Sequence, residues 1–352
     1  MTGSKTNPGR FFEDFSVGQV LEHATPRTIT SGDVALTMGL YGARFAVQSS
    51  DAFAQAIGYP RAPVDDLLVF HTVFGKSVPD ISLNAVANLG YAECRFLEAV
   101  YPGDTLTASS KVIGLRENAN RATGVVWVRT AGRNQQGETV LEFVRWVMVR
   151  KRDKSSPAPA AVVPTLAERV EPAALGQAVP EFDRARYDIA LAGSPYRWDD
   201  YAVGERIDHA DAMTLEEAEH QIATRLYQNT AKVHFNQHEQ AQGQFKRRLV
   251  YGGVVISLAR ALSFNGLGNA FHVAGINGGR HVAPCFAGDT VYAWSEVLDA
   301  AEIPGRDDIG ALRVRLTAAK NRNCADFPRQ NEKGEYAEGV ILDLDLWLLL
   351  PR

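Results

Sequence analysis

Hydrophobic and polar positions follow two patterns along the chain, and each pattern occurs twice. Runs of apolar residues at helical length occupy 67–77 and 254–264, and both are too apolar for a surface helix. Segments of alternating or β-branched apolar residues, typical of strands, follow each run. We predict two buried helices, each followed by antiparallel strands. The predicted strands lie at 111–115, 124–131, 140–149, 312–319 and 340–349.

A shorter helix is predicted ahead of each buried one. Thr30 precedes Asp33 by three residues, and Thr214 precedes Glu217 by three. A hydroxyl three residues before an acid is typical of a capped helix start. Helices packed on antiparallel strands in each half predict an α+β fold in which a sheet wraps the long helix.

The two halves also repeat each other's sequence. Residues 14–18 and 40–48 return at 200–204 and 226–234. This separation is far longer than the roughly 20–50 residues of a solenoid unit. We therefore infer a duplicated domain whose two copies pair as a pseudo-dimer.

Proline and alanine are concentrated between the two copies. Residues 153–183 contain five prolines, a composition typical of an extended spacer. The predicted organisation is an N-terminal domain at 1–152, a linker at 153–185 and a C-terminal domain at 186–352.

Length and composition fit two ordinary globular domains. The chain has 352 residues, 45% of them hydrophobic, and a net charge of −4, so no overall field favours nucleic acid or anionic lipid. Cys94, Cys285 and Cys324 form no CxxC pair, which argues against zinc and against a disulfide framework. Residues 1–10 are polar, and the apolar run at 341–350 is too short to span a bilayer. We expect a cytoplasmic homo-oligomer that binds neither nucleic acid nor membrane.

One segment resembles a known enzyme motif. Residues 228–234 end in His234 and are followed by Tyr251-Gly252-Gly253. They resemble the motif of the MaoC-like dehydratase family, which is similar to Gly-Asp-x-Asn-Pro-x-His followed by a His-Gly pair that opens the central helix. The family's histidine matches His234, whereas its aspartate falls on Asn229.

Longer strings extend the resemblance over the whole chain. Residues 7–15, 24–30, 225–231 and 303–306 are similar to members of this family that act on mesaconyl-CoA. The resemblance implies a double hot-dog fold and reversible hydration of mesaconyl-CoA to β-methylmalyl-CoA. It also implies an acyl-CoA substrate and no metal or redox cofactor.

Hydration of an unsaturated thioester needs proton transfer and donors for the charge that develops on the thioester oxygen. His234 is the candidate for proton transfer, because an imidazole titrates near neutral pH. Asn229 cannot act as a base, because a carboxamide accepts no proton, so we expect it to position water or substrate. Gly252 and Gly253 open a predicted helix, and their amides are candidate donors to the enolate oxygen.

The second proton carrier stays open among four alternatives. His238 and Glu239 lie just beyond His234. Asp65 and Asp66 take the place of the two glycines in the other half. His234 could serve both steps with one water, or the substrate's own carboxylate could assist that water.

The first copy lacks the candidate histidine and carries Gln48 in its place. We expect this copy to have lost its own site and to form the other wall of the acyl pocket. His23 and His209 match between the copies, so we predict structural roles for them. His71 and His281 have no histidine counterpart and no predicted role.

Basic residues are candidates for binding the anionic parts of the substrate. Arg44, Arg225 and Lys232 lie in the aligned segments and are candidates for the substrate carboxylate. Arg247 and Arg248 belong to the densest basic run and are candidates for the coenzyme A phosphates.

Two other functions remain as alternatives. Thioesterases share the fold and usually need a carboxylate or an activated water at the carbonyl. A non-catalytic acyl-CoA-binding protein is also compatible with a chain in which one copy has lost its site.

Overall fold

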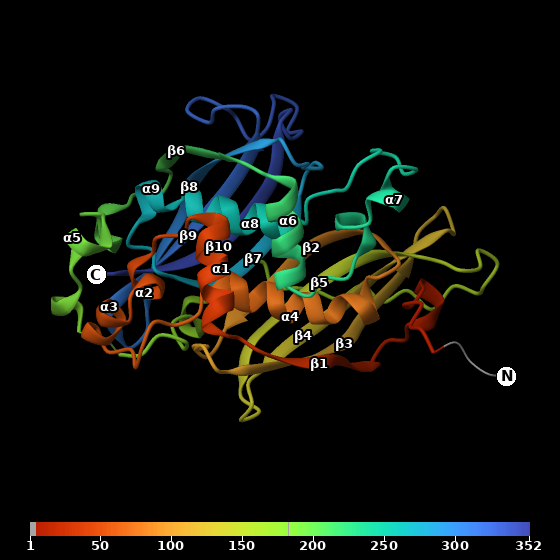
Figure 1. The fold of residues 1–352 in the computed structure, drawn as a ribbon, viewed down its shortest axis with the longest axis horizontal. Helices are drawn as coiled ribbons and strands as arrows, with labels where there is room; N and C mark the ends of the chain where they lie inside the picture. Colours follow the sequence, from red (N-terminus) through yellow and green to blue (C-terminus); the bar gives the residue numbers. More distant parts are fainter. Residues whose placement is uncertain (1–4, 182) are drawn as a thin grey trace.

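A single antiparallel sheet of ten strands forms the frame of the part of the chain that the computed structural model describes, residues 5–181 and 183–352. The first four residues of the predicted N-terminal domain lie outside this part. The strand order is β1-β3-β4-β5-β2-β7-β10-β9-β8-β6 (Figure 1). The first five strands are β1 (Val20–Thr28), β2 (Ala85–Phe96), β3 (Thr105–Glu117), β4 (Thr123–Arg133) and β5 (Thr139–Arg150). The second five are β6 (Arg206–Thr214), β7 (His272–His281), β8 (Thr290–Ile303), β9 (Arg306–Lys320) and β10 (Val340–Pro351). Each predicted strand lies within one of these observed strands, and each observed strand is longer than its predicted range.

The two halves of the chain form equivalent halves of the sheet, which meet at its middle. β2 and β7 pair there, with Tyr91 opposite Gly279 and Cys94 opposite Ile276. The hydroxyl oxygens of Tyr41 and Tyr227, residues that are 186 apart in sequence, lie 2.6 Å from each other. Equivalent residues that touch in this way mark an approximate two-fold axis, which confirms the predicted pseudo-dimer.

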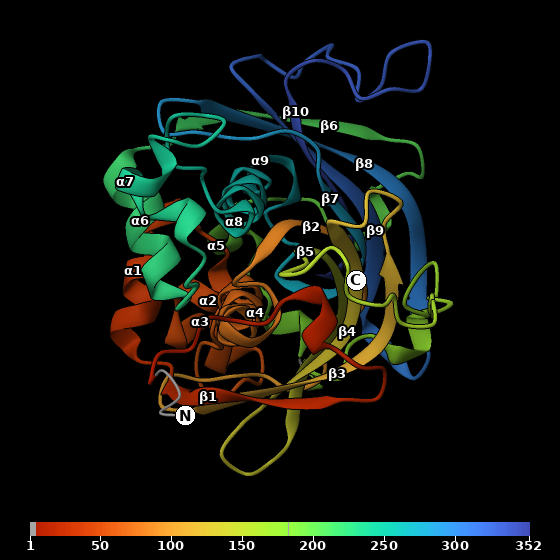
Figure 2. The ribbon, with the colours of Figure 1, turned by 90° about the vertical axis from the view of Figure 1, so that its right-hand side faces the viewer.

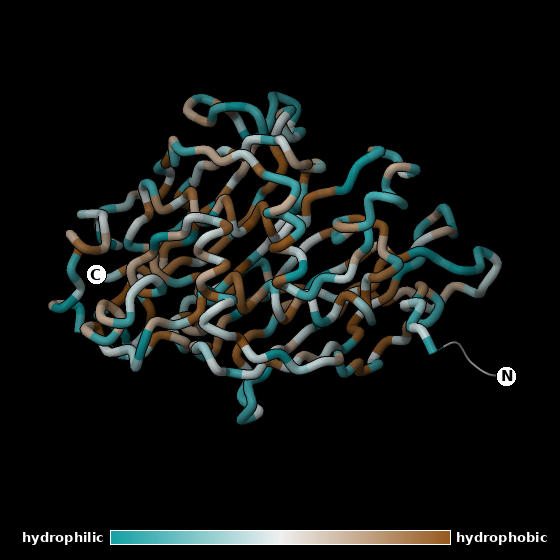
Figure 3. The backbone as a smooth tube through the Cα atoms, viewed as in Figure 1, coloured by the Kyte–Doolittle hydropathy of each residue, from teal (hydrophilic) through white to brown (hydrophobic). Residues whose placement is uncertain are grey.

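The sheet curves around two central helices, α4 (Asp66–Ile81) and α8 (Gly252–Leu262) (Figure 2). Thirteen residues of α4 are buried, and most buried apolar residues of both helices belong to one core that crosses the two halves. Figure 3 shows hydrophobic residues concentrated in the helices and the sheet, with polar loops at the ends. The predicted buried helices and the α+β double hot-dog fold are confirmed.

Shorter helices precede and follow the central ones. They are α1 (Ser31–Tyr41), α2 (Ala46–Ser49), α3 (Asp51–Ala56), α5 (Ile189–Ala192), α6 (Glu217–Leu226), α7 (Gln237–Gln240) and α9 (Phe264–Leu267). Short 3-10 turns occupy η1 (Phe12–Asp14), η2 (Pro172–Ala174), η3 (Arg184–Arg186), η4 (Trp198–Asp200) and η5 (Lys232–His234). Among helices of the described residues, none combines the length and apolarity needed to cross a bilayer.

One of the two predicted helix caps is wrong. Thr30 caps α1 as predicted, with its hydroxyl 3.2 Å from the amide of Asp33. Thr214 instead ends β6, where its hydroxyl lies 2.7 Å from that of Thr290. The pairing of β6 with β8 continues through this residue, so the chain leaves the sheet later and α6 is capped by Glu216.

The linker is packed onto the sheet and does not stand free as a spacer. The amide of Val170 donates to Asn277 of β7 (2.7 Å), and its carbonyl accepts from Trp347 of β10 (2.9 Å). Leu175 and Val179 are buried beside it. Prolines lack the amide donor of a strand ladder, and the side chain of Arg306 on β9 donates to the linker carbonyls of Gly176, Val179 and Pro180. The domain boundaries at 152 and 186 stay a prediction.

Candidate active site

A cavity of about 340 Å³ lies between the two halves. The first half contributes residues of α4, β2 and β5, which include Phe74, Val78, Tyr91 and Arg145. The second half contributes Asn229, His234, Tyr251, Gly252 and His281. The cavity therefore brings together His234, Asn229 and Gly252, which the sequence predicted as one site, and its other wall comes from the first half as expected.

His234 is fixed by the segment that precedes α8. The amide of Leu249 donates to the carbonyl of Val233 at 3.0 Å, and His234 Nδ1 lies 3.1 Å from the carbonyl of Leu249. A carbonyl only accepts hydrogen bonds, so Nδ1 carries the proton in the neutral ring. Nε2 makes no hydrogen bond to a described residue, which leaves its lone pair available at the cavity wall.

The protonation state of His234 follows from its surroundings. Burial lowers the pKa of His234 from 6.5 to about 4, because a positive ring is poorly solvated there. The ring is therefore neutral near pH 7 and can accept a proton. Once protonated, it is a strong acid that readily returns the proton.

Asn229 is also fixed by the backbone. Its Oδ1 accepts from the amide of Ala231 at 2.9 Å, which fixes the orientation of the carboxamide because an NH₂ group cannot accept from an amide. The Nδ2 group makes no hydrogen bond within residues 5–181 and 183–352. Asn229 lines the cavity, where this arrangement allows it to donate to a water or a hydroxyl.

The two glycines open α8 as predicted, but they differ in position. Helix α8 has Tyr251 at its N-cap and no side-chain cap, and neither glycine amide donates to another described residue. Gly252 lines the cavity. Gly253 lies deeper, where a Cβ would overlap the rings of Tyr251 and His71.

His281 is a cavity residue to which the sequence assigned no role. Its Nε2 lies 3.0 Å from the hydroxyl of Tyr91, and its ring packs directly against the α-carbon of Gly252. Burial lowers the pKa of His281 to about 4, so this ring is also neutral near pH 7. A histidine without a counterpart in the other copy was the signal available in the sequence.

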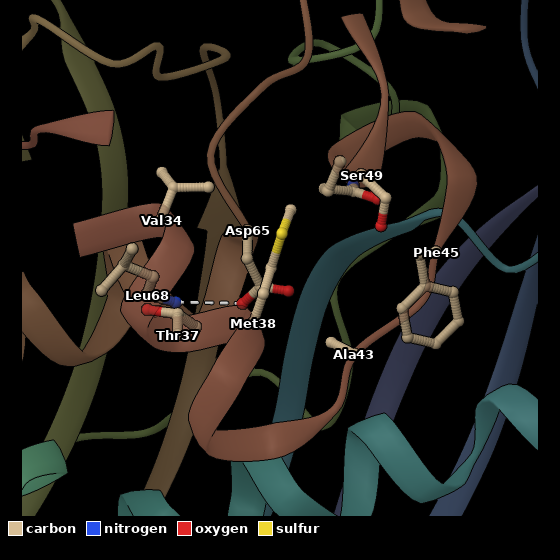
Figure 4. A pocket seen from close by; sticks show the side chains of 9 residues that line it. Val34, Thr37, Met38, Ala43, Phe45, Ser49, Asp65 and Leu68 are labelled. Carbon is tan, nitrogen blue, oxygen red and sulfur yellow. Dashed lines mark hydrogen bonds between the residues drawn. The ribbon is translucent and has the colours of Figure 1, made fainter. Parts of the chain in front are cut away.

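The matching place in the first half is almost filled. Two small spaces remain there, one of about 20 Å³ beside α1, lined by Ala43 and Asp65 (Figure 4), and one of about 10 Å³ lined by Gln48, Asp66 and Phe96. A space of that size holds about one water molecule. Gln48 donates to the carbonyl of Phe271, and Asp65 caps α4 by accepting from the amide of Leu68 at 3.1 Å. This copy has no room for an acyl chain.

The first residues of the two central helices show that the predicted alignment of Asp65 and Asp66 with Gly252 and Gly253 is wrong by one residue. Helix α4 begins at Asp66 and α8 begins at Gly252. Asp66 therefore corresponds to Gly252, and Asp65 corresponds to Tyr251, one residue away from the predicted pairing. The resemblance of the two short strings was too weak to fix the register.

Two of the alternatives for a second proton carrier lie outside the cavity. His238 and Glu239 are exposed on α7, and Glu239 pairs with Lys232. Asp65 belongs to the pocket of the first half. Asp66 binds His272 Nδ1 at 2.9 Å. None of the described cavity residues is an Asp or a Glu.

The basic residues predicted for the substrate carboxylate are also outside the cavity lining. Arg44 stacks over Phe264, Arg225 is exposed, and Lys232 lies 3.1 Å from Glu239. None of the three therefore contacts this cavity.

The basic run lies beyond the cavity rim. Arg247 donates to the carbonyl of Ala287 and stacks over Phe286, close to the rim residue Cys285. Arg248 is bound to Glu217. Arg247 therefore has no acidic partner among the described residues, whereas Arg248 has one.

The matched histidines are held in the frame of each half. His23 binds Asp80 and Ser110, and His209 binds the carbonyl of Asn265 and the hydroxyl of Ser295. Both nitrogens of each ring have partners, which supports structural roles. His71 is buried against α8, with neither ring nitrogen bonded within the described chain. The three cysteines are free and buried, and the described residues contain no cluster of three or more His, Cys, Asp or Glu suited to a metal.

Comparison with known proteins gives long and specific matches. A model of the mesaconyl-CoA hydratase family matches residues 3–327. The β-methylmalyl-CoA dehydratase of Chloroflexus aurantiacus is 62% identical over 99% of both chains. The mesaconyl-CoA hydratase of Cereibacter sphaeroides is 61% identical over 99% of this chain and 100% of its own.

Solved structures support the fold. A MaoC domain protein dehydratase from Chloroflexus aurantiacus superposes with a TM-score of 0.97 and 61% identity over 99% of both chains. A protein from Mycobacterium tuberculosis described as a double hotdog fold gives a TM-score of 0.73 at 26% identity, over 98% of this chain and 99% of its own.

Proposed function

Because the chain belongs to the mesaconyl-CoA hydratase family, we propose that it is a hydro-lyase that reversibly adds water to mesaconyl-CoA to give β-methylmalyl-CoA. The observation that carries the proposal is the pairing of one acceptor and one donor at the cavity. His234 Nε2 has a free lone pair, and Asn229 Nδ2 has free protons. Together they can accept one hydrogen bond from a single water molecule and donate one to it.

In the first step a water held by these two groups attacks the β-carbon. The water accepts a hydrogen bond from Asn229 and donates to His234 Nε2. As its oxygen bonds to carbon, its proton passes to His234. The π electrons of the double bond move to the thioester oxygen, which becomes an enolate.

The start of α8 stabilises that enolate. The amide of Gly252 is a free donor at the positive end of the helix dipole, and glycine lets the thioester approach closely. In the second step the enolate collapses and the protonated His234 returns its proton to the α-carbon. A single imidazole thus serves both steps with one water, and no atom is gained or lost beyond that water.

The alternative functions are less well supported. A thioesterase that depends on a carboxylate would need an Asp or a Glu at the carbonyl, and the described cavity residues include neither. A protein that only binds acyl-CoA does not need an imidazole with a free lone pair and a carboxamide with free donors in the same cavity.

The proposal includes expectations about the cell. We propose that the enzyme works in the cytoplasm as a homo-oligomer, on an acyl-CoA substrate and without metal or redox cofactor. Arg247, which is exposed and stacks over Phe286 beyond the cavity lining, is the candidate for a coenzyme A phosphate.

The test is a hydration assay with matched histidine variants. The purified protein should remove the absorbance of the unsaturated thioester of mesaconyl-CoA, and a thiol reagent should detect no free coenzyme A. His234→Ala should lower kcat by roughly 10²–10⁴-fold. His238→Ala, four residues away and exposed, should leave it unchanged. Full activity in His234→Ala, or release of the free thiol, would refute the proposal.

A further inference from the structure

Arg145 is a buried cation at a position where the fold does not require one. It lies on β5 opposite Val128 of β4, and Leu346 of β10 lies opposite Val314 of β9. Val128 and Val314 are equivalent in the repeat, so Leu346 is the counterpart of Arg145. The second half thus places an apolar residue at the same point of the sheet, and the reason for the arginine must lie in what surrounds it.

The Arg145 side chain is 0% exposed and has no acidic partner among the described residues. Its Nη2 donates to the hydroxyl of Ser77 at 2.8 Å, its Nη1 lies 3.4 Å from the hydroxyl of Ser82, and the guanidinium stacks over Phe74 at 4.2 Å. The Nε group has no partner in the described chain. Neutral hydroxyls and a ring therefore surround a charge that burial strongly disfavours.

The electrostatics agree with this geometry. Burial lowers the pKa of Arg145 to about 10, and the hydroxyls of Tyr91 and Tyr251 counter that shift only in part. A buried guanidinium normally has a carboxylate beside it. The missing anion is the unusual feature of this part of the core.

Arg145 is also the one Lys or Arg among the described residues that line the cavity. Resting on the function proposed above, we propose that Arg145 binds the free carboxylate at the far end of the acyl chain and so selects dicarboxylic acyl thioesters. The planar guanidinium fork suits a carboxylate, and Ser77 orients that fork. The thioester would then lie at Gly252 and the carboxylate at Arg145, on opposite halves of the chain.

Binding of unreactive substrate analogues tests this role apart from catalysis. Succinyl-CoA and butyryl-CoA have acyl chains of the same length and differ by a carboxylate in place of a methyl group. Calorimetric titration of the wild-type protein should give a clearly lower Kd for succinyl-CoA. Arg145→Leu, which copies the residue at the matched position, should weaken succinyl-CoA binding by roughly 30-fold or more and leave butyryl-CoA within about threefold.

The same contrast should appear in turnover. For mesaconyl-CoA, kcat/KM should fall by a similar factor in Arg145→Leu and less in Arg145→Lys, which keeps the charge but loses the fork. Hydration of (E)-2-methylcrotonyl-CoA, in which a methyl group replaces the carboxylate, should not fall. Arg116→Leu, an exposed change of the same charge on β3, is the matched control and should leave kcat/KM unchanged for both substrates.

The outcomes separate this inference from the proposed function. If the wild-type protein does not hydrate mesaconyl-CoA, the proposed function fails, and the titrations still decide whether Arg145 binds a carboxylate. If Arg145→Leu and Arg145→Lys weaken both analogues equally, Arg145 has only a structural role. If Arg145→Leu leaves succinyl-CoA binding unchanged, the inference is wrong.

Discussion

His234 and Asn229 are each held by one bond to the backbone on the side away from the cavity. The bond to Leu249 directs a lone pair inward, and the bond from Ala231 directs a donor inward. Both side chains are uncharged near neutral pH. A cavity without a fixed negative charge suits an anionic substrate, which the aspartate expected at position 229 would repel. The replacement of a general base by a carboxamide is therefore consistent with a diacid substrate.

The lowered pKa of His234 predicts the pH dependence of the reaction. Hydration needs the neutral ring, and the neutral ring persists as the pH falls until it approaches the pKa of about 4. For the wild-type enzyme, kcat/KM should thus show no acid limb near the ordinary value of 6.5. Initial rates between pH 5 and 8 in buffers of constant ionic strength test this prediction. A drop of about fivefold between pH 6.5 and 5.5 would show that the ring titrates normally.

The starts of the two central helices differ in how their first amides are satisfied. In α4 the carboxylate of Asp65 accepts from Leu67 and Leu68 at 3.0 and 3.1 Å. Helix α8 has no side-chain cap, so its first amides are available to a ligand. The first amides of the central helix are thus bonded by a side chain of the chain itself in one half and available to substrate in the other.

Replacing Gly252 should damage the site through its neighbour His281. The added methyl group of Gly252→Ala would overlap the imidazole of His281, and moving that ring breaks its bond to Tyr91. We expect kcat/KM for mesaconyl-CoA to fall by about 10–100-fold, while the far-ultraviolet circular dichroism stays native.

The control for this variant is another helical glycine. Gly39 of α1 has open space around the position of a Cβ, so Gly39→Ala should keep full activity and be slightly stabilising. Normal activity of Gly252→Ala would show that the close packing against His281 is not needed.

The whole molecule has two related regions whose cavities differ greatly in size. The cavity beside His234 has a volume of about 340 Å³, whereas the matching region of the first half keeps only two spaces of about 20 and 10 Å³. Both smaller spaces are lined by Gln48, which is tied to the backbone of the other half. The duplicated chain therefore contains one usable site.

Ligand stoichiometry tests that conclusion. Calorimetric titration with succinyl-CoA should give one binding site per chain, because the two smaller spaces cannot accept an acyl group. Gln48→His should not create a second site, and loss of its buried bond should lower the free energy of unfolding by about 1 kcal/mol. Two equivalent sites in the wild-type protein would contradict this view.

Periodicity and the internal repeat predicted the frame of the molecule well. The apolar runs gave both central helices, and the alternating segments lay in β3, β4, β5, β9 and β10. The wrong cap at Thr214 has a physical cause, because strand pairing overrode a local preference. The packed linker could not be foreseen, since its partners Asn277 and Trp347 lie far away in sequence.

The candidate site was predicted in part. His234 and Asn229 were found because they lie in one short motif. Arg145, Tyr91 and His281 come from strands whose sequences read as ordinary sheet, and only the fold brings them to one cavity. Local sequence patterns carry no information on contacts between distant strands, so Arg145 could not be identified as a cavity residue from the sequence.

Joining two copies in one chain removes the constraint of symmetry. In a homodimer of single units the dyad relates two interface sites, so any residue placed at one site is copied at the other. Here one copy carries Arg145 and the other carries Leu346 at the equivalent point of the sheet. One site can therefore gain a charged wall that the other site lacks, whereas identical subunits would place the same residue at both.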